Sequence, residues 1–141
     1  MFKLATKTEL RQINNSHRFF GRIGNLGVSY DKVQTLYGEI EPANALYILN
    51  KKYGLPNSGA IDDYKMTFEY VFRSNKFPAV YYTIYDYKGY MSCGFGVPLN
   101  MKISKKTGEI LNSELQKLLI EAFAPINHYD YLLTVEGLKE E

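Results

Sequence analysis

The sequence predicts a single α+β domain over residues 1–141, with an antiparallel β-sheet centred on a 64–88 hairpin and helices packed mainly on one face. Two runs rich in aromatic and β-branched residues, 64–73 and 79–87, flank a short polar turn, which predicts the hairpin. Apolar residues recur at helical spacing before and after this hairpin. The length of 141 residues suits one ordinary domain, and no linker or repeat divides it.

Before the hairpin, the sequence predicts two helices and one strand. Thr6 and Glu9 have the spacing of a capping box, which predicts a helix over 7–14, and residues 17–23 are typical of a strand. Ser29 suits the N-cap of a helix over 30–37, and Gly38 suits its end.

A third helix and a loop lead into the hairpin. Pro42 suits the first turn of this helix, and Gly54 provides its stop. Residues 55–63 contain proline, glycine, asparagine and aspartate, so they are predicted to form a loop.

Alternation within the hairpin assigns its side chains to two faces. In the first strand one face contains Tyr64, Met66, Phe68, Tyr70 and Phe72, and the other contains Lys65, Thr67, Glu69, Val71 and Arg73. In the second strand, Val80, Tyr82 and Ile84 oppose Tyr81, Thr83, Tyr85 and Tyr87.

The C-terminal part is predicted less completely, since 91–98 is interrupted by glycines and receives no assignment. Residues 101–104 and 109–111 resemble a second small hairpin that turns at 105–108. Ser113 and Gln116 form a capping box, which predicts a helix with an apolar stripe. The stripe consists of Leu115, Leu118, Leu119, Ala122 and Phe123. A last strand is predicted around 131–135.

Composition narrows the classes of function. Hydrophobic residues at 45% and charged residues at 23% are typical of a globular protein, and a net charge of +2 gives no strong nucleic-acid signal. No apolar run is long enough to span a bilayer, and the first residues lack a signal-peptide core. The expectation is therefore a cytoplasmic protein with no membrane partner.

Catalytic patterns are weak, so the sequence predicts no catalytic residue, no metal ligand and no cofactor. The two histidines are not in a paired motif, and the glycines at 21–27 lack the spacing of a nucleotide-binding loop. The one cysteine, Cys93, excludes an internal disulfide and suits a small buried thiol. Four carboxylates near or within the hairpin leave open a small hydrolase or nuclease, and they are Asp62, Asp63, Glu69 and Asp86.

A tyrosine-rich face of the hairpin is the best candidate binding surface. It comprises Tyr81, Thr83, Tyr85 and Tyr87 beside Lys65, Glu69 and Arg73. Tyrosine combines a large contact area with a polar tip and is enriched at binding surfaces. The alternative is that these aromatic residues pair across the strands beneath a helix and only stabilise the sheet.

Three stretches of the chain resemble a family of small phage-encoded proteins. They are SYDKVQTLYGE at 29–39, YKMTFEY at 64–70 and IYDYK at 84–88. The family pattern is SYxxLxxxFGEP, then YKxxxEW, then IYDYK, and the similarity covers residues 17–90. This chain departs from the pattern at Tyr37, Ile40 and Tyr70. The resemblance implies a phage origin and a shared fold.

Two functions follow as expectations. The first is a phage protein that inhibits a host protein, such as a component of an antiphage-defence system, by stoichiometric contact through the tyrosine-rich face or an adjoining helix. The second is a protein that sequesters a nucleotide ligand in a pocket lined by Arg18, Arg22, Arg73 or Lys88. Exposed strand edges and abundant tyrosine leave a homodimer open.

Overall fold

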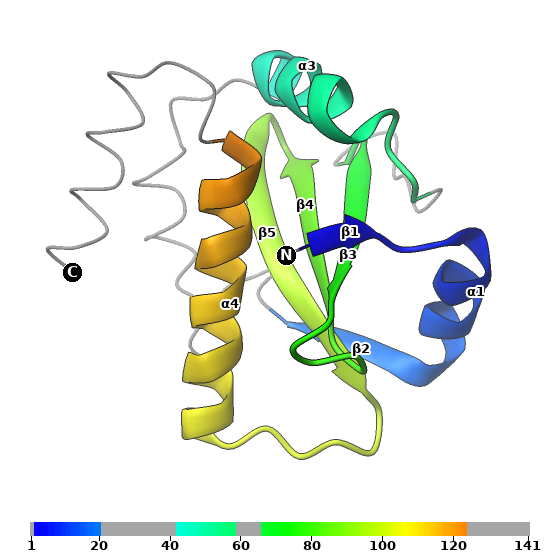
Figure 1. The fold of residues 1–141 in the computed structure, drawn as a ribbon, viewed down its shortest axis with the longest axis vertical. Helices are drawn as coiled ribbons and strands as arrows, with labels where there is room; N and C mark the ends of the chain where they lie inside the picture. Colours follow the sequence, from blue (N-terminus) through cyan, green and yellow to red (C-terminus); the bar gives the residue numbers. More distant parts are fainter. Residues whose placement is uncertain (1, 21–41, 59–65, 124–141) are drawn as a thin grey trace, which may run out of the picture.

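A computed structural model describes residues 2–20, 42–58 and 66–123, and it confirms the α+β class. Five strands form one antiparallel sheet in the order β1-β3-β4-β5-β2 (Figure 1). The strands are β1 (Phe2–Leu4), β2 (His17–Phe20), β3 (Glu69–Ser74), β4 (Tyr81–Tyr87) and β5 (Tyr90–Pro98). The described helices are α1 (Lys7–Ser16), α3 (Pro42–Tyr53) and α4 (Lys105–Phe123).

The predicted hairpin occupies the middle of the sheet as β3 and β4. A two-residue turn then connects β4 to β5, where Tyr87 pairs with Tyr90. Both turn residues, Lys88 at φ 50° and Gly89 at φ 84°, have positive φ, as in the tight turns that match the twist of antiparallel strands. The three central strands are therefore joined by short local connections.

Both edges of the sheet come from the N-terminal part of the chain. β1 pairs with β3, and β2 pairs with β5, so α1 connects one edge of the sheet to the other. β1 was not predicted, because three residues are too few for an alternation pattern.

The helices lie mainly on one face, as predicted. α3 and α4 cover the face that presents Tyr70, Phe72 and Tyr82, which is the main hydrophobic core. α1 packs on the opposite face against Val71 and Tyr81, forming a smaller core, and lies away from α3 and α4 (Figure 1).

The predicted second hairpin at 101–111 is wrong, and so is the predicted start of the helix at a Ser113–Gln116 capping box, because both residues lie inside α4. α4 begins at Lys105, because the Ser104 hydroxyl accepts a hydrogen bond from the Thr107 amide at 3.1 Å, as an N-cap does. Gly108 is buried inside the helix instead of forming a turn. The unassigned run 91–98 belongs to β5, whose glycines lie in a central strand of the sheet.

The remaining predictions near the hairpin are confirmed, or fall outside the described residues. α1 has the predicted capping box, and α3 begins at Pro42 and ends before Gly54, which has φ 88°. The predicted helix at 30–37, the strand at 131–135, residues 21–23 and residues 59–63 lie outside the described residues.

Candidate functional site

The hairpin register brings several predicted binding residues together. Glu69 pairs with Tyr85 and Arg73 pairs with Tyr81, and Thr83 lies between the two tyrosines on the same face. The alternation in the sequence therefore predicted correctly which side chains share a face.

This face is nevertheless interior, which corrects the expectation of an exposed surface. Tyr81, Thr83, Tyr85 and Glu69 are all less than a tenth exposed. Tyr81 packs with Ile13 of α1, so a helix covers an aromatic residue of the sheet, as the alternative interpretation stated. Strand alternation assigns a face but does not indicate what packs on it.

Of the residues predicted to bind a nucleotide, Arg18 and Lys88 lie at distant positions along β5. Arg18 in β2 pairs with Val97 near the end of β5, whereas Lys88 precedes the start of β5. Seven strand residues separate these positions along β5, which corresponds to about 24 Å. Lys65, Arg22 and the side chain of Arg18 lie outside the described residues.

Lys88 and Tyr87 form a small contact at the β4–β5 turn. The Lys88 Nζ lies 5.5 Å from the centroid of the Tyr87 ring, within the range of a cation–π interaction. Lys88 is exposed and Tyr87 is partly buried. Among the predicted binding residues that the structure describes, these two and Arg73 retain accessible area.

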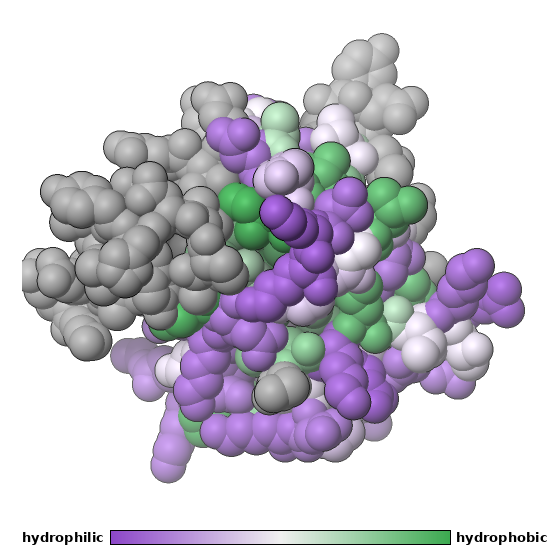
Figure 2. Space-filling model, turned by 45° about the horizontal axis from the view of Figure 1, so that its top comes forward, coloured by the Kyte–Doolittle hydropathy of each residue, from purple (hydrophilic) through white to green (hydrophobic). Residues whose placement is uncertain are grey.

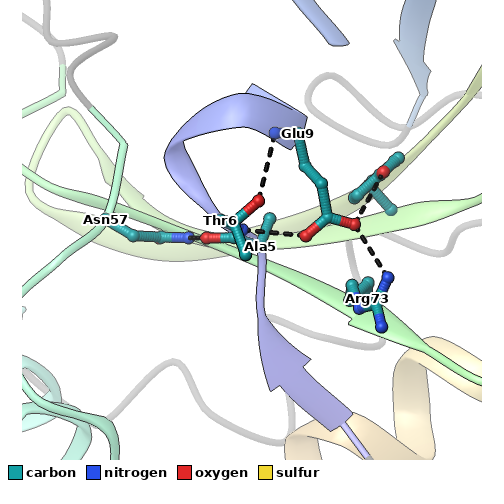
Figure 3. A network of polar contacts seen from close by, with 6 residues as sticks. Ala5, Thr6, Glu9, Asn57 and Arg73 are labelled. Atoms are coloured by element: carbon teal, nitrogen blue, oxygen red, sulfur yellow. Dashed lines mark hydrogen bonds and ion pairs between the residues drawn. The ribbon is translucent and has the colours of Figure 1, made fainter. Parts of the chain in front are cut away.

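Glu9 connects the start of α1 to the sheet (Figure 3). Its Oε1 accepts from the Thr6 amide at 2.9 Å, and the Thr6 hydroxyl accepts from the Glu9 amide at 3.2 Å. Its Oε2 accepts from Arg73 Nη1 at 2.9 Å and from the Tyr81 hydroxyl at 3.2 Å. A single carboxylate therefore closes the capping box and fastens α1 to β3 and β4.

The environment of Glu9 favours its ionised form. Burial acts to raise the pKa of its carboxyl, but hydrogen bonds from Thr6 and Arg73 and the Arg73 charge outweigh burial, so the pKa is lowered. Burial and the nearby Glu9 carboxylate raise the pKa of Tyr81. The cluster is thus a salt-bridged anchor with a neutral tyrosine.

Asn57 makes a second connection beside this anchor. Its Nδ2 donates to the Ala5 carbonyl at 3.0 Å and to the Val71 carbonyl at 2.8 Å, and its Oδ1 accepts from the Val71 amide at 2.8 Å. The side chain bridges the segment after α3, the start of α1 and β3. These polar contacts hold separate parts of the chain in place.

The two carboxylates of the hairpin are both occupied by protein donors. Glu69 Oε1 accepts from the Ser58 hydroxyl at 2.8 Å, and its Oε2 accepts from the Thr83 hydroxyl at 2.7 Å. Asp86 accepts from the Thr67 amide at 2.7 Å and the Phe68 amide at 3.0 Å, and also from the Thr67 hydroxyl. Both side chains are buried, which gives them a structural role in the sheet.

The histidine and the cysteine in the described residues also have structural surroundings. His17 Nδ1 lies 2.8 Å from the Ser16 hydroxyl, its Nε2 lies 2.8 Å from the Ala79 carbonyl oxygen, and its ring packs edge-on against Tyr81. Cys93 is fully buried in the main core, and burial raises the pKa of its thiol, which keeps it protonated.

Within the described residues, the buried hydroxyls of Tyr82 and Ser92 have no hydrogen-bond partner. Tyr82 belongs to the main core, whereas Ser92 pairs with Tyr85 and lies on the opposite face of the sheet. Because the sheet separates the two hydroxyls, they do not form one polar site.

The α3 helix is held at its C-terminal end by two tyrosines. The Tyr53 hydroxyl donates to Glu121 Oε2 of α4 at 3.0 Å, and the Tyr70 hydroxyl of β3 donates to the Gly54 carbonyl at 2.7 Å. Burial raises the pKa of Tyr70 to about 12, so this donor stays protonated at neutral pH. α3 is therefore fixed to both the sheet and α4.

The outer side of α3 presents an accessible aromatic residue. Ala45 and Leu49 are buried, and Tyr47 on the opposite side of the helix is 66% exposed. The Lys51 Nζ lies 5.7 Å from the Tyr47 ring centroid, and Leu55, just after the helix, is 75% exposed. We call Tyr47, Lys51 and Leu55 the α3 surface.

Figure 2 turns the α3 end of the molecule towards the viewer and shows hydrophobic side chains among hydrophilic ones there. Tyr47 was not among the residues predicted to form a binding surface. A signal was present, because Tyr47 does not belong to the apolar side of α3 that contains Leu46, Leu49 and Tyr53. An aromatic residue outside the apolar stripe of a helix indicates surface exposure.

In residues 2–20, 42–58 and 66–123, no three metal-binding side chains are grouped closely enough to hold an ion. None of the helices described there has the length and apolarity needed to cross a membrane. No protein-family model, curated protein or solved structure matches this chain.

Proposed function

We propose that this chain is a non-catalytic binding protein that acts by stoichiometric contact with another protein through the α3 surface. The observation that carries the proposal is the exposure of Tyr47, 66%, on the side of α3 opposite its buried residues. Tyrosine is among the residues that contribute most binding energy at protein interfaces.

The rigid support of α3 favours this role. Tyr53 and Tyr70 hold the end of the helix through hydrogen bonds to Glu121 and Gly54. A side chain presented by a fixed helix loses little backbone entropy when a partner binds. The cation–π contact from Lys51 further restricts the Tyr47 ring.

The surroundings of the potentially reactive groups also support binding over catalysis. The carboxylates of Glu69 and Asp86 are buried and accept hydrogen bonds from protein hydroxyls and amides. The Cys93 thiol is buried and its pKa is raised, which disfavours the reactive thiolate.

The resemblance to small phage-encoded proteins suggests the class of partner. It rests on sequence segments such as IYDYK at 84–88. On this basis we propose that the partner is a host protein of an antiphage-defence system and that binding inhibits it.

Affinity capture from bacterial lysate tests the proposal, with proteins and small molecules both identified. Wild-type protein and the Leu99→Ala variant should retain the same partner in a fixed ratio, and Tyr47→Ala should lose it. Leu99 is a matched control because it is another exposed large hydrophobic residue, outside the α3 surface.

Two results would contradict the proposal. One is equal capture by Tyr47→Ala and wild type. The other is capture of no protein together with release of a nucleotide on denaturation, which would indicate a sequestering protein instead.

A further inference from the structure

Positive side chains outnumber negative ones among the residues that the structure describes. The residues that the structure describes include thirteen of the 17 lysines and arginines but only six of the 15 aspartates and glutamates. All ten lysines among the described residues are exposed.

The carboxylates in this part contribute little to its surface. Only Glu109 is exposed among them. Each of the others accepts a hydrogen bond from the protein or forms an ion pair with a protein side chain. They are Glu9, Glu69, Asp86, Glu114 and Glu121. Exposed lysines consequently dominate the electrostatics of the described surface.

Exposed lysines lie along α4, just before it, and in the β3–β4 connection that contacts it. Lys76 and Lys117 both contact Glu114 Oε2, at 3.5 and 2.9 Å, and their side chains are 56% and 62% exposed. One buried carboxylate serves two lysines, so positive charge remains in excess. Lys102, just before α4, and Lys105 and Lys106 in its first turn are also exposed, and none of the described carboxylates forms an ion pair with them.

An apolar side chain accompanies these lysines. Ile110 is 41% exposed and lies one turn after Lys106 and two turns before Lys117, on the same side of α4. We call Lys76, Lys102, Lys105, Lys106, Lys117 and Ile110 the α4 basic surface.

We propose that the α4 basic surface docks an acidic protein segment that also presents apolar side chains. Charge complementarity selects an acidic partner, and Ile110 supplies an apolar contact that a phosphate backbone would not use. Among the described residues this surface has no arginine, and the Phe77 ring beside Lys76 packs against the main core, so groups on which nucleic-acid bases stack are scarce there. This site lies apart from the α3 surface, so it adds a second contact to the proposed function and does not depend on it.

The lysine pair at the start of α4 allows binding to be separated from folding. Neither Lys105 nor Lys106 contacts Glu114, and acidic residues in the first turn of a helix are stabilising. The variant Lys105→Glu/Lys106→Glu should therefore fold with unchanged or higher stability. Lys3→Glu/Lys88→Glu makes the same change in net charge at exposed lysines outside this surface.

Fluorescence anisotropy with a labelled helical peptide of glutamate and leucine provides the test. We expect salt-sensitive binding that Lys105→Glu/Lys106→Glu weakens about tenfold or more. Lys3→Glu/Lys88→Glu should bind as wild type. Ile110→Ser should weaken binding of the glutamate–leucine peptide but should not change binding of a glutamate–serine peptide.

Three outcomes would overturn the proposal. They are no binding of the acidic peptide, equal binding by the two charge-reversal variants, or tighter binding of a DNA duplex or anionic lipid vesicles that is lost in Lys105→Glu/Lys106→Glu. None of them bears on capture of a partner through Tyr47, so the two proposals fail separately.

Discussion

The Glu9 side chain joins three residues, because its two oxygens accept from Thr6, Arg73 and Tyr81. We expect Glu9→Gln to lower the free energy of unfolding by about 1 to 2 kcal/mol, since it removes the charge from the capping box and the ion pair. Urea denaturation at neutral pH measures this change. Glu109→Gln, at an exposed site, is the control and should have no measurable effect.

The same residue predicts a pH dependence. Folding lowers the pKa of the Glu9 carboxyl below its ordinary value of 4.5. The ionised carboxylate therefore stabilises the fold fully at pH values above 4.5, and this stabilisation is lost as the pH falls through the lowered pKa of the folded state. Glu9→Gln should therefore lose less stability than wild type on acidification. Parallel acid sensitivity of the two proteins would show that Glu9 is not an anchor.

Tyr81 distinguishes a core tyrosine from a binding tyrosine. We expect Tyr81→Phe to reduce stability by about 0.5 to 1.5 kcal/mol, because its hydroxyl donates to Glu9. Its partner binding should equal that of wild type, since the ring is 7% exposed. Thermal unfolding and affinity capture measure the two quantities, and impaired capture by a fully folded variant would restore the tyrosine-rich face as a contact surface.

At the scale of elements, the beginning of α4 is decided by its cap. Ser104→Ala should cost about 1 kcal/mol, because the Thr107 amide loses its acceptor. Ser113→Ala should be neutral or stabilising, since this exposed residue lies inside the helix, where alanine is favourable. Denaturant unfolding measures both variants, and the reverse ranking would mean that the helix begins at Ser113.

The end of α3 also depends on the backbone conformation of Gly54. Gly54 has φ 88°, and an added Cβ would meet nothing within 4 Å, so Gly54→Ala should cost about 1 kcal/mol through strain without a clash. Gly54→Asn should cost less, because asparagine tolerates this conformation. Equal stability of the alanine variant and wild type would argue against the positive φ.

For the molecule as a whole, the sequence predicted the features that depend on interactions between residues close together in the chain. Alternation assigned the two faces of β3 and β4, and the Thr6–Glu9 spacing predicted the start of α1. Pro42 and Gly54 marked the limits of α3. In each case the deciding interaction lies within a few residues of sequence.

Tertiary contacts determine two features that were not predicted from the sequence, which are strand β5 and the burial of the tyrosine-rich face. β5 contains glycines that weaken its alternation, and it becomes a central strand because β4 and β2 pair with it. Tyr81 is buried because Glu9 and Ile13 of α1 reach it. Burial of the tyrosine-rich face therefore could not be read from the hairpin itself.

A comparison of Tyr47→Ala with wild type, in both partner affinity and thermal stability, tests whether the α3 surface is the binding site. Titration calorimetry with the captured partner should show affinity weakened about 30-fold or more, as for an interface residue that contributes at least 2 kcal/mol. The melting temperature should be unchanged or slightly raised, since Tyr47 is exposed and alanine favours helix. Unchanged affinity, or a melting temperature that falls together with affinity, would contradict the assignment of the α3 surface as the binding site.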